Sequence, residues 1–218
     1  MHVCLASTSP ARLQLLRQAG IEPRTLAPDV DEDAVIADTE RAQGRRLPPA
    51  EHVLLLARRK AADVAARLAD AESDFAGFVV GGDSMFELDG EILGKPYTPD
   101  AAAARWRAMR GRTGVLHSGH SVIRLGPGSP AVEAHAVAEA SVTFRGDVTD
   151  GEIAAYVATG EPLHVAGAFT VDSLGGAFIE RVEGDPSTVV GMSLSTVRGL
   201  VRDLGGEWTA LWNRATTS

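Results

Sequence analysis

The sequence predicts a single α/β domain in which helices flank a mixed β-sheet. Short apolar runs, such as those at residues 3–6 and 78–80, are typical of buried strands. They alternate with longer segments whose apolar residues recur at helical spacing, and the clearest of these covers residues 51–69. With 218 residues the chain can bury a complete core, and no repeat or long linker divides it.

The N-terminal part predicts a strand followed by a well-bounded helix over residues 10–20. Ser9 suits the N-cap of this helix, Pro10 its first turn, and Gly20 the position just past its end. Residues 22–50 predict an irregular segment that is acidic in the middle and leads into the 51–69 helix.

The next segment is the most informative of the chain. The buried strand Phe78–Val80 ends in two glycines, and Asp83 is the first charged group beyond them, where ligand crevices of open α/β sheets lie. Asp89-Gly90 predicts a tight hairpin turn, because both central positions of that turn need positive φ. The hairpin would return the chain to Gly94-Lys95-Pro96 and bring Lys95 near Asp83. An acid, a cation and a bare backbone together favour phosphate chemistry.

The remaining elements continue the alternation. They are a helix at 98–111, an antiparallel pair at 114–125 and 131–145, a short helix opened by a Thr149–Glu152 capping box, a strand near 177–182 and a helix at 194–204. The domain therefore covers residues 1–212, and we expect residues 213–218 to form a flexible tail.

Composition narrows the function classes. The net charge of −8 argues against a general nucleic-acid binder. No apolar run reaches the roughly eighteen residues of a membrane helix, and the N-terminus lacks the pattern of a secretion signal. The single cysteine, Cys4, excludes an internal disulfide. We expect a cytoplasmic protein with no nucleic-acid or membrane partner.

The start of the first helix is a candidate anion site. Free N–H groups at a helix N-terminus attract anions, and the hydroxyls of Ser7 and Ser9 add donors. Arg12 lies in the first turn, where the helix dipole disfavours a cation. Its position is explained if Arg12 and the helix N-terminus bind the same phosphate. The alternative is a capped helix with a solvated arginine.

Lys60, Glu32 and Asp83 are the other candidates. Lys60 falls within the apolar stripe of the 51–69 helix, so it either extends to the surface or reaches into a site. Glu32 and Asp83 could hold Mg²⁺ or Mn²⁺ against substrate phosphates, and Asp83 could instead, or also, accept a proton from an attacking water. Alternatively, the acidic run around Glu32 is a solvated loop.

In order and spacing, these blocks resemble the Maf family of nucleoside triphosphate pyrophosphatases over nearly the whole chain. The matching blocks are Leu5-Ala-Ser-Thr-Ser-Pro10 with Arg12, Asp29-Val-Asp-Glu32, Leu56-Ala57 with Lys60-Ala61, Val80-Gly-Gly-Asp83, Leu88–Pro96, Gly111-Arg-Thr113, Gly160-Glu-Pro-Leu163, Ala166–Phe169, Gly184-Asp185 and Val189–Leu194.

The resemblance implies hydrolysis of a nucleoside triphosphate between its α and β phosphates with a divalent metal cation, and Asp83 as the catalytic base. It implies that the phosphate and metal site is lined by Ser7, Arg12, Glu32, Lys60 and Lys95. It also implies an elongated mixed sheet flanked by helices, a central cleft like that of inosine triphosphatases, and a homodimer.

Four positions depart from the branch of the family that prefers dTTP and UTP. The resemblance implies that this branch has an Arg where the present chain has Ala11, a Thr in place of Ser84, a Lys in place of Val165 and a Gln in place of Asp172. Pyrimidine specificity therefore does not carry over. We expect Ser84 and Asp172 to contact substrate, with Asp172 accepting hydrogen bonds from an amino group of cytosine or guanine. The alternative is an exposed Asp172 beside a promiscuous site.

Two rival functions remain open at this point. A non-catalytic nucleotide-binding regulator, for example of cell division, would keep the cations and would not need Asp83. A broad metal-dependent phosphatase would release terminal phosphate instead of pyrophosphate. A nucleic-acid-binding module ranks last, because only 5% of the residues are aromatic and available for base stacking.

Overall fold

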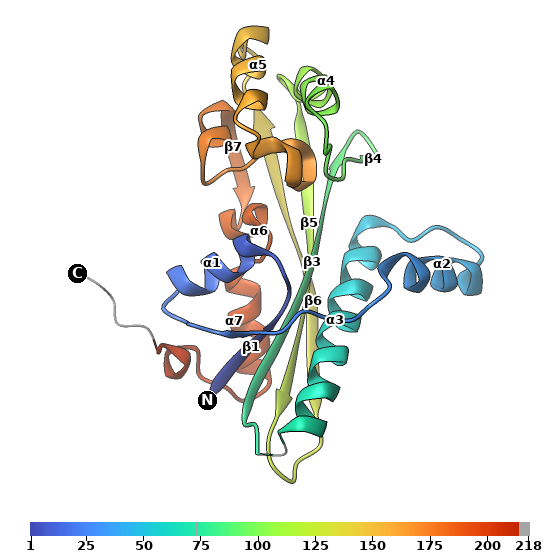
Figure 1. The fold of residues 1–218 in the computed structure, drawn as a ribbon, viewed down its shortest axis with the longest axis vertical. Helices are drawn as coiled ribbons and strands as arrows, with labels where there is room; N and C mark the ends of the chain where they lie inside the picture. Colours follow the sequence, from blue (N-terminus) through green and yellow to red (C-terminus); the bar gives the residue numbers. More distant parts are fainter. Residues whose placement is uncertain (73, 214–218) are drawn as a thin grey trace. The chain divides into compact units, whose positions relative to one another are not determined.

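A mixed sheet of seven strands organises the computed structural model, which describes residues 1–72 and 74–213 (Figure 1). The strand order is β2-β1-β3-β5-β6-β7, and β4 pairs with β3. Strand β1 runs parallel to β2 and β3, whereas β4 and β7 run antiparallel to β3 and β6. The strands are β1 (His2–Ala6), β2 (Arg24–Thr25), β3 (Gly77–Leu88), β4 (Glu91–Ile92), β5 (Thr113–Leu125), β6 (Val132–Phe144) and β7 (Ile179–Gly184). The predicted mixed α/β class is confirmed.

Seven α-helices accompany the sheet within the described ranges. They are α1 (Pro10–Gln18), α2 (Glu32–Gln43), α3 (Pro49–Ala71), α4 (Pro99–Met109), α5 (Asp150–Ala158), α6 (Pro186–Val190) and α7 (Leu194–Asp203). Short 3₁₀ helices occur at Glu161–His164, Ala166–Ala168, Leu174–Phe178 and Trp208–Leu211. Among the described residues, none of these helices combines the length and apolar character needed to cross a bilayer.

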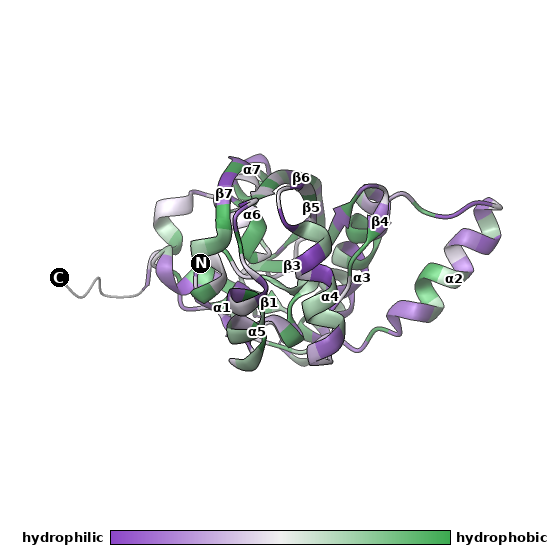
Figure 2. Cartoon of the chain, turned by 90° about the horizontal axis from the view of Figure 1, so that it is seen from above, coloured by the Kyte–Doolittle hydropathy of each residue, from purple (hydrophilic) through white to green (hydrophobic). Residues whose placement is uncertain are grey.

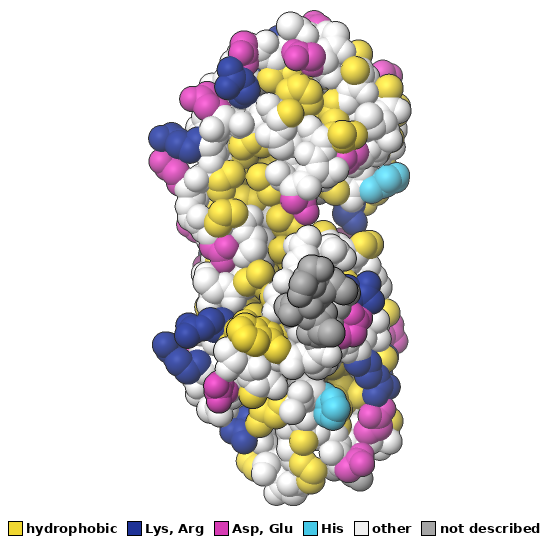
Figure 3. Space-filling view, turned by 90° about the vertical axis from the view of Figure 1, so that its left-hand side faces the viewer, with side chains coloured by type: hydrophobic (Ala, Val, Ile, Leu, Met, Phe, Trp, Pro, Cys, Tyr) yellow, Lys and Arg dark blue, Asp and Glu magenta, His cyan; other side chains and the backbone are white. Residues whose placement is uncertain are grey.

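The contacts group the chain into two compact units, each with its own core. The first unit contains Met1–Asp83, Ser118–Ala138 and the chain from Gly191 onward, and the second contains Ser84–His117 and Glu139–Val190. Aliphatic side chains from β1, β3 and α3 fill a core of the first unit. The second core is aromatic, with edge-to-face contacts of Phe86 and Trp106 to Phe144. On the face shown in Figure 3, acidic and basic side chains are interspersed.

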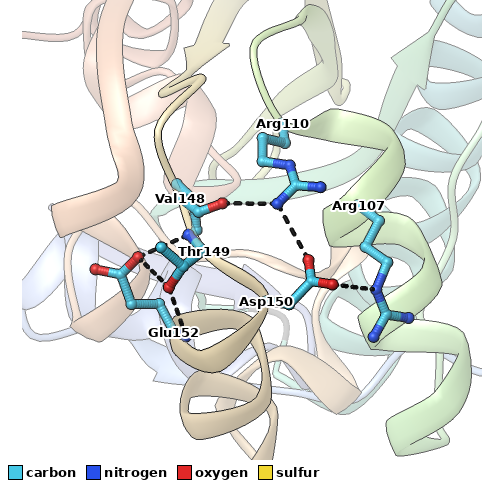
Figure 4. A network of polar contacts seen from close by, with 6 residues as sticks. All are labelled: Arg107, Arg110, Val148, Thr149, Asp150 and Glu152. Atoms are coloured by element: carbon cyan, nitrogen blue, oxygen red, sulfur yellow. Dashed lines mark hydrogen bonds and ion pairs between the residues drawn. The ribbon is translucent and has the colours of Figure 1, made fainter.

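The capping signals in the sequence correspond to real helix ends. At α1, the Ser9 side chain accepts from the Arg12 N–H, Pro10 occupies the first turn, and Gly20 has a φ of 85°. At α5, the Thr149 N–H donates to Glu152 at 2.7 Å, while the Glu152 N–H donates to Thr149 Oγ1 at 3.2 Å (Figure 4). Local hydrogen bonding therefore sets both boundaries.

The prediction of an irregular segment over 22–50 is wrong, because this segment contains β2 and α2. Asp31 caps α2 by accepting from the Ala34 N–H at 3.0 Å, and Glu32 and Asp33 lie in its first turn. Negative charge is favourable there, so the acidic run begins a helix and is not a solvated loop. Helix α2 has no buried residue, and Figure 2 shows hydrophilic residues along much of it. Its weak apolar periodicity explains why the sequence pattern concealed it.

The sequence predicted that strand β3 ends before Asp83. That prediction is wrong, because β3 continues through the glycines to Leu88. Gly81 is required by close packing, since a Cβ there would lie 2.4 Å from the Ala57 carbonyl oxygen. The predicted hairpin beyond β3 is confirmed: Asp89 and Gly90 both have positive φ, 52° and 84°.

The structure describes only the first residue of the predicted C-terminal tail, Asn213. The Asn213 N–H donates to the Gly20 carbonyl at 3.0 Å, and its side chain accepts from the Glu22 N–H at 2.6 Å. Asn213 is therefore anchored to the end of α1. The rest of the predicted tail, residues 214–218, lies outside the described residues.

Candidate functional site

Helix α3 approaches the sheet of the first unit at two glycines that leave no room for a side chain (Figure 1). A Cβ on Gly81 of β3 would also lie 2.8 Å from the Ala61 Cβ, and one on Gly119 of β5 would lie 2.3 Å from the Val53 carbonyl oxygen. The α3 backbone is thus held close to β3. This packing brings Lys60, one residue before Ala61, within reach of Asp83.

Lys60 joins two carboxylates inside the first unit. Its Nζ lies 2.8 Å from Asp83 Oδ1 and 2.9 Å from Glu32 Oε1. The side chains of Lys60 and Asp83 are only 9% and 14% exposed, whereas that of Glu32 is 48% exposed. Lys60 therefore does not extend to the surface from the apolar stripe but reaches into a polar site. Of the two alternatives that the sequence left open for Lys60, the structure therefore shows the second, in which the ammonium contacts other charged groups.

Arg12 extends the same group of charges from α1. Its Nε donates to the Gly191 carbonyl at 2.8 Å, and its Nη1 donates to Ser7 Oγ at 3.3 Å. Burial lowers the pKa of Arg12, and the charges of Asp83 and Glu32 oppose that effect, so the guanidinium acts on both carboxylates. Together, Ser7, Arg12, Glu32, Lys60 and Asp83 form what we call the charge cluster.

Two further features shape the charge cluster. Gly82 leaves space for the Arg12 side chain, since a Cβ there would lie 3.3 Å from the Arg12 Nε. Ser7 Oγ accepts from the Ser9 N–H at 3.1 Å, which orders the turn into α1. Ser9 itself is used as the helix cap, so its hydroxyl already serves the backbone. The contact of Arg12 with the Gly191 carbonyl was not predicted, because the two residues lie 179 positions apart in the sequence.

The cluster has the chemistry to hold a phosphate-bound divalent cation. Glu32 and Asp83 offer carboxylate oxygens that converge on one point, the position taken by the Lys60 ammonium. Across residues 1–72 and 74–213, no group of three or more His, Cys, Asp or Glu side chains is arranged to bind a metal. Mg²⁺ commonly uses only one or two carboxylates and takes its other ligands from water and phosphates. The donor set therefore fits a metal that arrives with a polyphosphate.

Three predicted substrate-binding residues, Ser84, Lys95 and Asp172, belong to the second unit. Ser84 is half-buried on β3, while Lys95 and Asp172 are exposed in segments outside the helices and strands. Two hydrogen bonds join the segments that carry the exposed pair: the Gly167 N–H donates to the Leu93 carbonyl, and the Tyr97 N–H donates to the Leu163 carbonyl, each at 2.9 Å. The contacts of these three residues with substrate stay predictions.

Comparison with known proteins gives a consistent result. A family model described as "Maf-like protein" matches residues 2–204. A relative from Leifsonia xyli subsp. xyli, named "Nucleoside triphosphate pyrophosphatase", is 58% identical over 218 residues, covering 100% of both chains. Relatives with the same name are 50% identical in Salinispora tropica, covering 100% of this chain and 90% of that one, and 51% identical in Rhodococcus jostii, covering 95% and 94%.

Proposed function

The chain belongs to the Maf-like protein family, and from this we propose that it is a hydrolase that cleaves nucleoside 5′-triphosphates at the α–β linkage. The products are a nucleoside monophosphate and pyrophosphate. The observation that supports this most directly is the charge cluster, in which Lys60 lies 2.8 Å from the mostly buried Asp83, with Arg12 beside them. The names of the relatives support the substrate class.

The chemistry of the reaction explains why such a cluster is useful. A triphosphate repels an incoming hydroxide, so catalysis depends mainly on neutralising charge and placing the water in line. Arg12 and Lys60 supply positive charge. Asp83 accepts a proton from the water whose oxygen bonds to phosphorus while the α–β linkage breaks and pyrophosphate leaves. Glu32 and Asp83 would hold a divalent cation, which when bound neutralises phosphate oxygens.

Other residues have secondary roles in this proposal. Ser7 and the start of α1, capped by Ser9, donate hydrogen bonds to phosphate oxygens, and Lys95 adds positive charge to the polyphosphate. Ser84 and Asp172 contact the base. We further propose that the protein is a homodimer located in the cytoplasm. Its binding partner is the nucleotide substrate, and it binds neither nucleic acid nor membranes.

A panel of canonical and methylated nucleoside triphosphates, assayed with Mg²⁺ or Mn²⁺, tests the proposal. We expect pyrophosphate and nucleoside monophosphate in equal amounts, and loss of turnover when a chelator removes the metal. Release of single phosphates would instead indicate a terminal phosphatase. Tight nucleotide binding without turnover of any member of the panel would favour a non-catalytic regulator.

A further inference from the structure

A single carboxylate in the second unit, that of Glu161, gathers an unusual number of donors. Its Oε1 accepts from the Tyr156 hydroxyl at 2.9 Å, the Thr170 hydroxyl at 2.5 Å and the Gly175 N–H at 3.1 Å. Its Oε2 accepts from the Ser173 hydroxyl at 2.8 Å and the Leu174 N–H at 3.3 Å. We call Glu161 and these five donors the Glu161 hub. Most of its donors belong to one short turn, residues 170–175.

The ionisation of Glu161 agrees with this geometry. Burial by itself raises the pKa of Glu161, but the hydrogen bonds from Thr170, Ser173, Gly175 and Tyr156 outweigh it and lower the pKa to about 2. Glu161 is therefore a pure acceptor at neutral pH. An ionised carboxylate can serve five donors, whereas an amide would turn an NH₂ group toward some of them.

The turn that the hub fixes carries Asp172. Thr170 and Ser173, on either side of Asp172, are both bonded to Glu161, while Asp172 itself is exposed. The turn is also tightly packed: a Cβ on Gly175 would lie 2.6 Å from the Tyr156 hydroxyl oxygen and 2.7 Å from the Thr170 carbonyl oxygen. Asp172 therefore projects from a backbone that is held from inside at both of its ends.

We propose that Glu161 is a positioning residue for base selection, which acts by holding the 170–175 turn so that Asp172 meets the amino edge of a nucleobase in one geometry. This inference rests on the proposed function. Hydrogen-bond recognition discriminates well only when the recognising group is fixed beforehand, because a mobile carboxylate adapts to several bases and spends binding energy on ordering. Loosening the hub should therefore equalise substrates rather than abolish turnover.

A double-mutant cycle with Glu161→Gln and Asp172→Asn tests this role. The readout is the ratio of kcat/KM for CTP or GTP to that for UTP, measured by pyrophosphate release. We expect each single variant to shift the ratio by on the order of tenfold, the effect of about one hydrogen bond, and the double variant to shift it no further. Additive shifts, or an unchanged ratio in either single variant, would overturn the proposal.

A matched control separates positioning from stability. Glu152→Gln removes another hydrogen-bonded carboxylate of the second unit, the one that accepts from the Thr149 N–H and hydroxyl (Figure 4). This variant should lower the melting temperature and leave the base ratio unchanged. An equal shift in the ratio of Glu152→Gln would show that loss of stability alone changes selectivity, and would also overturn the proposal.

Two further outcomes remain distinguishable. If Glu161→Gln does not fold, Ser173→Ala removes one donor from Oε2 and should shift the ratio in the same direction by a smaller factor; no shift overturns the positioning role. If the wild-type protein releases pyrophosphate from no triphosphate, the proposed function fails. If the wild type releases pyrophosphate but the kcat/KM ratio is the same in Glu161→Gln, only the positioning role is rejected.

Discussion

The charge cluster and the Glu161 hub satisfy their carboxylates in opposite ways. In the charge cluster, Asp83 and Glu32 are paired with the ammonium of Lys60. In the Glu161 hub, every donor is a neutral hydroxyl or backbone N–H. Neutral donors belonging to a turn fix that turn. A cation paired with two carboxylates can instead be exchanged for another cation, or shared with an incoming anion, at a modest net cost in free energy. The hub is suited to holding geometry, and the cluster to exchanging charge.

The strongest test of this comparison is the removal of the base from the charge cluster. Asp83→Asn keeps the shape of the side chain but cannot accept the proton, so we expect kcat to fall by about 10²–10⁴-fold while nucleotide binding persists. Pyrophosphate release and equilibrium nucleotide binding measure the two effects. Asp63→Asn is the matched control, because Asp63 pairs with Arg67 on the same unit and should leave kcat unchanged. If the kcat of Asp83→Asn stays within tenfold of the wild-type value, Asp83 is not the general base.

Removing the cation of the cluster should be the next largest effect. Lys60→Met leaves the mostly buried Asp83 carboxylate without its ammonium, which should destabilise the fold by about 3 kcal/mol. Urea unfolding measures this change. Mg²⁺ or Mn²⁺ should raise the melting temperature of the variant more than that of the wild type, because the carboxylates lose their internal competitor.

The control for Lys60→Met lies on the same helix. Arg67→Met breaks an exposed pair with Asp63, whose cost should stay below about 1 kcal/mol, and it should show no enhanced response to the metal. Equal stabilisation of both variants and the wild type by the metal would contradict exchange of cations at the cluster.

Acid should lower the contribution of the Glu161 hub to the stability of the fold. The pKa of Glu161 lies below its ordinary value of 4.5, at about 2, so its contribution to stability is complete above pH 4.5 and is lost as the pH falls toward 2. The urea midpoint of the wild type should therefore decline more steeply over this range than that of Glu161→Gln. Parallel pH profiles for the two proteins would show that the hub is not ionised as described.

The smallest effect is expected at the α5 cap, which resembles the hub in using neutral donors but serves only one helix end. Thr149→Ala removes the hydroxyl that accepts from the Glu152 N–H, and should cost about 1 kcal/mol of unfolding free energy. Turnover and base preference should both stay unchanged. A loss of activity larger than the loss of stability would imply that α5 acts on the reaction.

Local patterns in the sequence predicted the parts of the molecule that depend on local physics. The apolar stripe on α3 identified Lys60 as misplaced, and the structure pairs it with two carboxylates. The caps at Ser9 and Thr149 and the turn at Asp89-Gly90 are likewise properties of a few adjacent residues. These features could be predicted because the interactions that create them span only three or four positions.

The parts that could not be predicted depend on distant residues. Gly81 and Gly82 suggested the end of a strand, whereas they make room for α3 and Arg12. The five donors of Glu161 include residues whose approach depends on the fold of the whole 156–175 segment. Glycine is required in turns and at close contacts alike, so its presence does not distinguish the two before the fold is known.

The tight seat of α3 on β3 has a consequence for the length of the chain. Each residue of an α-helix turns the next by about 100°, so one residue inserted between Ala57 and Lys60 would rotate the ammonium away from the carboxylates. Loops can absorb such a change in length, but a helix whose backbone touches a glycine cannot slide to restore the angle. In this segment the number of residues is as much a determinant of the reaction as their identity.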